Sequence, residues 1–145
     1  MKIIQTEIEI NAPVATVWRH LIDFSVYPQW NPFITSAEGD PEADARLKIT
    51  VVPQGGKPMT FRPVVTRFYP ESELRWVGRL GGLSFLFEGE HYFRLEAVGE
   101  GVTHFAQSEE FRGVLVPFVW KSMSKGTRAG FEEMNLALKK RSENG

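Results

Sequence analysis

The chain has 145 residues, the usual length of one domain and short for two. Hydrophobic residues make up 42% and charged residues 24%, which is typical of a globular protein rather than a disordered one. The 17 basic and 18 acidic residues nearly cancel, so the sequence offers no electrostatic footprint for a nucleic acid. The absence of cysteine excludes disulfides, thiolate metal ligands and cysteine nucleophiles. We predict one domain over residues 1–145.

Motifs for targeting, metals and cofactors are missing from the sequence. No stretch approaches the roughly 18 apolar residues of a membrane helix, and Glu7 and Glu9 interrupt the N-terminus too early for a signal peptide. Three histidines without cysteine leave little for zinc, and no phosphate-binding loop is present. We therefore expect a cytoplasmic protein that does not insert into membranes and uses neither a metal nor a cofactor.

The first forty residues predict one strand followed by two short helices. Residues 2–10 alternate between apolar and polar side chains, as in a strand with one buried face. Pro13 suits the first turn of a helix, and apolar residues recur at helical spacing from Val14 to Ile22. Residues 23–36 hold two prolines and four aromatic side chains, which predicts a broken second helix and a loop.

Strands and then one long helix are predicted for the rest of the chain. Short joints between apolar runs favour an antiparallel meander with strands over 46–52, 58–69, 73–80, 84–97 and 102–111. From residue 114 the spacing becomes helical, which predicts a helix over 114–139 of about 38 Å. The segregation of strands from helices indicates the α+β class. We expect a strongly bent antiparallel sheet of about six strands, wrapped around the C-terminal helix with a space between them.

Three stretches of the chain carry a family resemblance. They are Ala12-Pro13-Val14 through Asn31-Pro32, Phe87-Glu88-Gly89-Glu90-His91-Tyr92-Phe93, and Gln107-Ser108-Glu109-Glu110-Phe111 with Gly113. With them, nearly the whole chain resembles the START-related SRPBCC superfamily of helix-grip proteins, in particular its polyketide cyclase/dehydrase and lipid-transfer branch. The resemblance implies a helix-grip fold that holds an apolar or aromatic ligand between sheet and C-terminal helix. Some members are cyclases, hydratases or hydrolases, and many only bind or carry a ligand.

The two strands over 84–97 and 102–111 carry the polar residues of the candidate site. A hairpin closed by Gly99-Glu100-Gly101 sets their predicted register. That register pairs Val98 with Val102, Leu95 with Phe105, Phe93 with Gln107, and His91 with Glu109. His91, Gln107 and Glu109 then become polar groups on an otherwise apolar wall, where an unpaired carboxylate would be costly.

The pair of His91 and Glu109 admits two interpretations. In the first, it is an acid/base or ligand-orienting pair inside a dry cavity. In the second, it is a structural cross-strand pair, or Glu109 lies at the strand end beside water. A bulge at residues 109–110 would exchange Glu109 for Glu110 on the inner face.

We predict that aromatic, aliphatic and polar side chains border one space between the sheet and the long helix. The tryptophans suit either core or lining positions, and the proline-stiffened loop around Trp30 suits a lid. The predicted ligand-binding residues are Trp30, Trp76, Phe87, His91, Phe93, Gln107, Glu109, Trp120 and Met123.

Three functions fit this sequence. The first is a protein that binds a small apolar or aromatic ligand, lipid-like or polyketide-like, oriented by His91, Gln107 or Glu109. The second is an enzyme of the polyketide cyclase or dehydratase type, in which Glu109 and His91 would be the catalytic residues that move protons. The third is an interaction module with a filled core. A small hydrophobic ligand is the expected partner, and both a monomer and a homodimer are compatible with the sequence.

Overall fold

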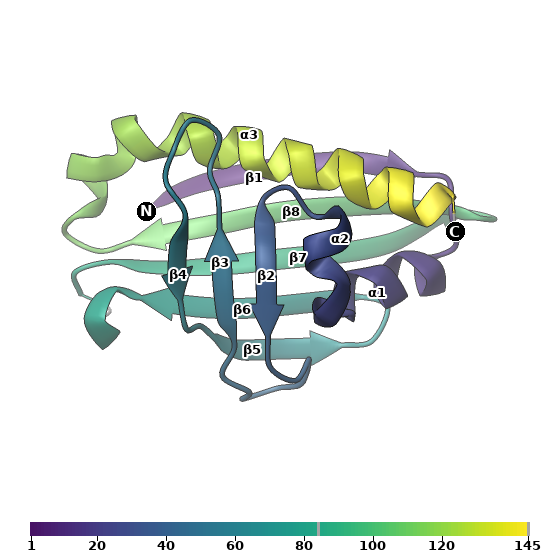
Figure 1. Ribbon diagram of the computed structural model, residues 1–145, viewed down its shortest axis with the longest axis horizontal. Helices are drawn as coiled ribbons and strands as arrows, with labels where there is room; N and C mark the ends of the chain where they lie inside the picture. The colour runs from purple at the N-terminus through teal and green to yellow at the C-terminus, as the bar shows by residue number, and fades with distance from the viewer. Residues whose placement is uncertain (84, 145) are drawn as a thin grey trace.

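The computed structural model of the protein describes residues 1–83 and 85–144 (Figure 1). Four elements come first: strand β1 (Lys2–Ile10), helix α1 (Val14–Ile22), the 3₁₀ helix η1 (Phe24–Val26) and the short helix α2 (Tyr27–Trp30). They are followed by β2 (Ile34–Glu38), β3 (Lys48–Val51), β4 (Met59–Phe61), β5 (Val64–Tyr69) and β6 (Glu73–Arg79). The chain ends with the 3₁₀ helix η2 (Leu80–Gly82), β7 (Glu88–Gly99), β8 (Val102–Arg112) and helix α3 (Val116–Glu143).

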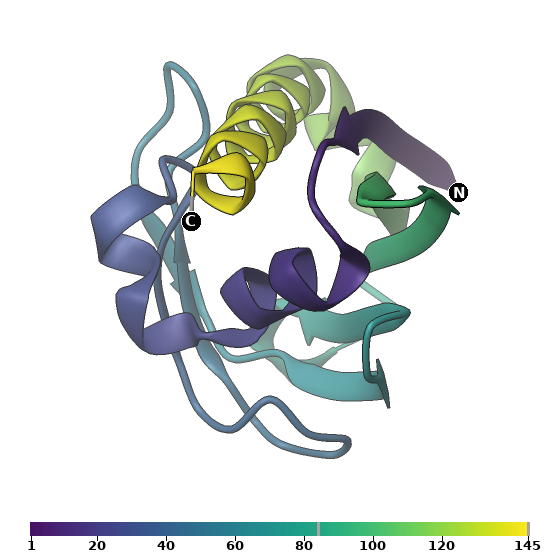
Figure 2. The ribbon, with the colours of Figure 1, turned by 90° about the vertical axis from the view of Figure 1, so that its right-hand side faces the viewer.

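Two antiparallel sheets surround the long C-terminal helix. The larger sheet has five strands in the order β1-β8-β7-β6-β5, and the smaller has three in the order β2-β3-β4. Seen nearly along α3, the smaller sheet lies on one side of the helix and β1 on the other (Figure 2). This arrangement confirms the predicted α+β class and the predicted sheet wrapped around the C-terminal helix.

The strand boundaries differ from the predicted ones at three places, and the first two lie between residues 34 and 69. Residues 34–38, which lie outside every predicted strand, form β2, because Ile34 and Ala37 pair with β3. The predicted strand 58–69 is two strands in different sheets, β4 and β5. The break comes at Pro63, which has no backbone N–H for a ladder and whose carbonyl oxygen instead accepts a hydrogen bond from Leu47 N at 2.8 Å.

A third difference concerns the start of β7, predicted at residue 84. Residue 84 lies outside the described residues, and the strand begins at Glu88. Before it, Gly81 and Gly82 have positive φ angles of 57° and 78°, which glycine adopts without a Cβ clash. These two glycines belong to the turn η2, which lies at the predicted joint between the strands 73–80 and 84–97.

The hairpin of β7 and β8 has almost the predicted register. Three of the predicted pairings are confirmed: Leu95 with Phe105, Phe93 with Gln107, and His91 with Glu109. The pairing of Val98 with Val102 is wrong, because the register shifts between Ala97 and Gly99 and places Gly99 opposite Val102. Such a bulge leaves one residue unpaired next to the tight turn without moving the strands beyond it.

Helix α3 packs on the inner surface through a row of apolar side chains in its C-terminal half. Phe131, Met134 and Leu138 are fully buried there. The helix approaches closely at Gly130, where a Cβ atom would overlap the ring of Phe33. The rings of Phe33 and Phe131 then meet edge to face, with their centroids 5.5 Å apart. Gly130 is therefore needed for this contact between the helix and the segment before β2.

We expect Gly130→Ala to lower the free energy of unfolding by about 1–3 kcal/mol, because the added methyl group overpacks the contact with Phe33. Alanine by itself favours a helix by about 1 kcal/mol, so the predicted sign is opposite to the helix propensity. Denaturant unfolding would measure the change. The control Gly99→Ala, whose Cβ would lie 3.8 Å from its nearest neighbour, should change stability by less than about 0.5 kcal/mol. A more stable Gly130→Ala protein would contradict this account.

Candidate functional site

A chain of five polar side chains runs through the otherwise apolar interior. Its members come from four elements: Thr6 from β1, His91 from β7, Gln107 and Glu109 from β8, and Asn135 from α3. Strand alternation puts Gln107 and Glu109 on the same inner face, and the hairpin register places His91 opposite Glu109. Thr6, His91, Gln107 and Asn135 are all buried. These five polar side chains therefore link three neighbouring strands to the long helix.

The donors and acceptors of this polar network can be assigned from its hydrogen bonds. The Thr6 hydroxyl donates to the backbone carbonyl oxygen of Gln107 at 2.9 Å, and Asn135 Nδ2 donates to Thr6 Oγ1 at 2.9 Å. Gln107 Nε2 donates to Asn135 Oδ1 at 2.8 Å. Since the amide nitrogen of Gln107 is used in this way, its Oε1 atom is the acceptor for His91 Nε2, 3.0 Å away. The network thus assigns a proton to Nε2 of His91.

With Nε2 protonated, the other ring nitrogen of His91, Nδ1, faces Glu109. Nδ1 of His91 lies 3.4 Å from Oε1 of Glu109. Two bare acceptors would repel each other, so the contact becomes attractive when one proton lies between the two atoms, on either the imidazole or the carboxyl group. A side-chain pair with one movable proton has the composition of a general acid/base.

Glu109, and not Glu110, faces inward with His91. The register has no shift at residues 109–110, so Glu110 lies on the outer face of the sheet. There it accepts hydrogen bonds from Tyr92 at 2.9 Å and from Arg112 at 2.5 Å. Burial and the two neighbouring carboxylates, Glu110 and Glu90, raise the pKa of Tyr92 to about 12. The outer face therefore carries a separate ionic cluster that takes no part in the inner network.

A glycine makes room for the inward carboxylate. A Cβ atom at Gly89 would overlap Oε2 of Glu109, and it would lie 3.7 Å from the ring of Phe111. Sequence reasoning missed Gly89, Thr6 and Asn135 as parts of the site. The only signal for Asn135 was a polar residue on a helical stretch whose neighbours at positions 131 and 138 are apolar.

Apart from Trp30, the predicted site residues form two groups, and the side chains of the first are in direct contact with one another. Trp76, His91, Phe93 and Gln107 are all buried. The His91 ring lies 4.4 Å from the ring of Phe93 and 5.4 Å from that of Trp76, measured between centroids. Phe131 of α3 closes the group at 5.0 Å from His91. This part of the inner surface is filled by the protein's own side chains.

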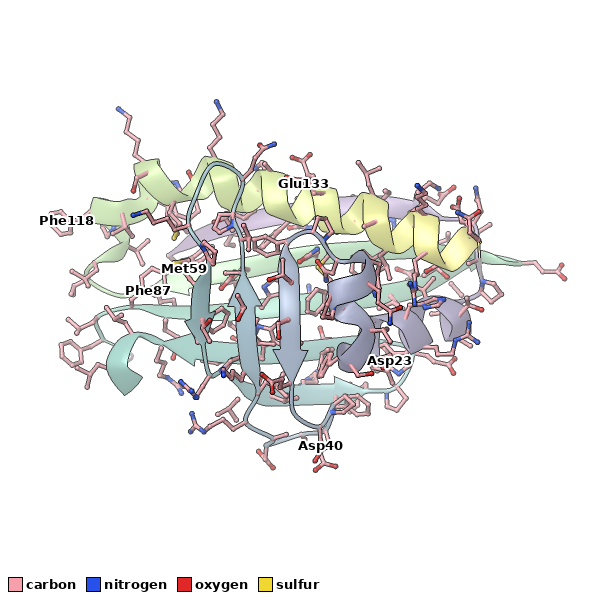
Figure 3. All side chains as sticks on the ribbon, viewed as in Figure 1. Asp23, Asp40, Met59, Phe87, Phe118 and Glu133 are labelled. Carbon is pink, nitrogen blue, oxygen red and sulfur yellow. The ribbon has the colours of Figure 1, made fainter. Side chains whose placement is uncertain are left out.

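The second group lies toward the beginning of α3 and is half-buried. Phe87, Trp120 and Met123 pack against the core without being enclosed by it. The ring of Phe111 links them, at 6.0 Å from Phe87 and 5.5 Å from Trp120. Figure 3 shows Phe87 at the end of the molecule where α3 begins. The Glu109 side chain, 18% exposed where His91 is 5% exposed, lies at the boundary between the two groups.

Trp30 is separated from the other predicted residues. It lines a surface depression of ≈ 620 Å³ beside the C-terminal end of α3, together with His20, Ala137 and Lys140. Ala137 lies 17 residues after Trp120, which is about 26 Å along a helix. Burial, together with the charges of Arg19 and Arg141, lowers the pKa of His20 at this place. The helix length thus keeps Trp30 away from the half-buried group around Trp120.

Metal sites and membrane spans can be assessed for residues 1–83 and 85–144. Within these residues, no group of three or more histidine or carboxylate side chains is arranged to hold a metal ion. No helix in the same part of the chain is both long and apolar enough to cross a membrane.

The family of the chain follows from a sequence match over almost its full length. Residues 1–143 match the family described as polyketide cyclase / dehydrase and lipid transport, and the chain belongs to this family. No curated protein sequence matches the chain significantly.

Solved structures share this fold at low sequence identity. Protein TTHA0849 from Thermus thermophilus has a TM-score of 0.76 and 18% identity, covering 99% of this chain and 98% of that one. A START superfamily protein from Mycobacterium smegmatis has a TM-score of 0.73 and 22% identity, covering 98% and 97%. A norcoclaurine synthase mutant from Thalictrum, in complex with a transition-state analogue, has a TM-score of 0.73 and 18% identity, covering 99% and 94%. These likenesses establish the helix-grip fold.

We expect His91→Ala and Glu109→Ala each to lower the free energy of unfolding by about 1–3 kcal/mol, because each removal leaves the other polar side chain without its contact partner. The double variant should lose less stability than the two single variants together, because the second substitution then leaves no polar side chain without a partner. Denaturant unfolding of the three variants measures the coupling. The matched control is Glu110→Ala with His91→Ala, on opposite faces of the sheet, whose effects should add. Additive losses for His91 and Glu109 would show that the two side chains do not interact.

Proposed function

We propose that this protein binds a small apolar or aromatic ligand carrying one hydrogen-bond donor, between the sheet and the first half of α3. The observation that carries the proposal is a partly exposed carboxylate, that of Glu109, on the same strand face as Phe111, whose ring packs against the half-buried Phe87 and Trp120. The ligand's apolar body packs against Phe87, Trp120 and Met123, and its donor group binds Glu109. Residues 1–145 act as one binding domain in this proposal.

The partial exposure of apolar side chains on the inner side of α3 is better explained by a ligand site than by a completed core. Trp120 and Met123 lie on the inner side of α3, yet both stay partly exposed while Phe131 and Met134 of the same helix are buried. Methionine is unbranched and flexible, so Met123 can change rotamer to admit a ligand of varied shape. An apolar ligand would complete the burial of these side chains at the beginning of the helix.

The polar anchor is held in advance by the buried network. His91 is fixed by Gln107, which is fixed in turn by Asn135. An anchor that is already positioned loses little conformational freedom when the ligand binds, which favours affinity. Glu109 accepts a hydrogen bond from a hydroxyl or amine of the ligand, and His91 holds the carboxyl group in place. The ligand class is therefore apolar and aromatic or lipid-like, with a hydroxyl or amine at one end.

Two probes that differ by one hydroxyl group test the proposal: naphthalene and 2-naphthol, titrated by fluorescence. We expect the protein to bind 2-naphthol about tenfold or more tightly than naphthalene, because a hydrogen bond to a charged group is among the stronger ones. Glu109→Gln should reduce this preference, and Trp120→Ala should weaken the binding of both probes. The control Leu136→Ala, on the exposed side of α3, should change neither affinity. Full affinity in Trp120→Ala, or no binding of either probe, would overturn the proposal.

A second candidate function is proton transfer on the bound ligand. It is favoured by the partly exposed Glu109 beside the buried His91: as a carboxylate, Glu109 can accept a proton from the ligand and later return it, while His91 positions the carboxylate. A suitable reaction is removal of a proton from the carbon between two carbonyl groups, the step that begins a polyketide-type cyclisation. In this reading Glu109 and His91 are catalytic residues, and the apolar walls shape the substrate.

Deuterium exchange into benzoylacetone in D₂O, followed by NMR, tests this second function. We expect the protein to accelerate exchange at the carbon between the carbonyls by about 10²-fold or more, which is the usual contribution of a general base. Glu109→Gln should lose the acceleration while still binding the compound. The control Glu110→Gln, on the outer face, should retain it. Exchange no faster than in buffer would leave ligand binding as the only function proposed.

A further inference from the structure

One end of the molecule exposes a cluster of large apolar side chains. Two segments carry it, one before β7 and one at the start of α3, and they are joined by backbone hydrogen bonds from Val114 N to Phe85 O at 3.0 Å and from Leu115 N to Leu86 O at 3.1 Å. We call this cluster the apolar end. Its exposed side chains are Leu80 (52%), Leu83 (45%), Phe85 (64%), Val114 (59%) and Phe118 (83%). Figure 3 shows Phe118 at the extremity of the molecule, beyond the start of α3.

The segment of the apolar end at the start of α3 carries charges of one sign. From residue 111 to residue 131 there are four basic residues and no acidic one. Lys121 and Lys125 are exposed on α3, one and two turns beyond Phe118. Lys57 is exposed on the loop between β3 and β4, whose Gln54 N donates to Gly126 O of α3 at 3.3 Å. Exposed lysines thus lie behind the apolar tips on two neighbouring elements.

We propose that the apolar end docks on the surface of an anionic lipid bilayer. Apolar side chains at a tip, with lysines set behind them, are the pattern of elements that lie in a membrane interface, where the apolar groups enter the acyl boundary and the lysines reach phosphates. Lysine is depleted from protein–protein interfaces, which disfavours a protein as the occupant. Docking of this kind needs no membrane-spanning helix, and none of the helices in the described residues is long and apolar enough to be one.

Docking would place the half-buried group of the candidate site next to the membrane. Trp120 and Phe87 belong to the same stretches of chain as Phe118 and Phe85. An apolar ligand could then pass between bilayer and protein with little exposure to water. This consequence rests on the proposed function, whereas the docking itself rests only on the exposed side chains and their charges.

Vesicle sedimentation tests the docking, with vesicles of phosphatidylcholine alone or mixed with phosphatidylglycerol. We expect the bound fraction to rise with phosphatidylglycerol and to fall with added salt. Phe118→Ser and Phe85→Ser should each weaken binding about tenfold, because each removes an apolar ring from the interface. The matched control is Leu136→Ser, which is 61% exposed on the same helix but far from the apolar end, and it should bind like the unchanged protein.

A second pair of variants separates charge from apolar contact. Lys121→Gln and Lys125→Gln should each weaken binding to the anionic vesicles about fivefold and reduce its salt dependence, while Lys140→Gln at the other end of α3 should not. Equal binding to both vesicle types, or an equal loss in Leu136→Ser and Phe118→Ser, would overturn the docking. So would a dimer of the unchanged protein that Phe118→Ser converts to monomers in sedimentation velocity. Retained 2-naphthol binding in Phe118→Ser would show that the ligand site is separate from the docking surface.

Discussion

The buried hydrogen bond between Gln107 and Asn135 is the contact on which the rest of the arrangement depends. A buried amide that lacks a partner costs about 1–3 kcal/mol, so Asn135 favours one placement of α3 over the sheet. Moving the helix by one residue would shift it by about 1.5 Å and rotate it by about 100°, which would break this bond and the one to Thr6. The same placement sets Gly130 against Phe33 and Phe131 against His91.

Fixing the helix in this way divides the interior into a closed half and an open half. The C-terminal half of α3 completes a core with Phe131, Met134 and Leu138, whereas the N-terminal half leaves Trp120 and Met123 partly exposed. Glu109 lies where the two halves meet. A carboxylate in the closed half would have no access to a ligand, and one on the outer sheet face would join the ionic cluster around Tyr92. This position is the reason why we propose Glu109 as the anchor for a ligand.

Local pattern was a good guide wherever neighbours in the chain are neighbours in the structure. The period of two along β7 and β8, together with a short turn, predicted that His91 faces Glu109. The same reasoning failed at Val98, where a bulge beside the turn absorbs one residue. It failed again at β2, whose short and mixed sequence becomes a strand only by pairing with β3. Pro63 could have been taken as a strand break from the sequence, since proline cannot donate to a ladder.

The sequence by itself determined the α+β class, the long C-terminal helix and the inward side of the β7–β8 hairpin, because these follow from periodicity and short turns. Only the tertiary structure decided which distant residues meet. Asn135 and Thr6 are 129 residues apart in the chain and share a hydrogen bond, while Trp30 and Trp120, predicted for one site, lie near opposite ends of α3. Contacts of this kind depend on how a helix is rotated and placed over a sheet, and that placement follows from the packing of the whole interior rather than from any local pattern.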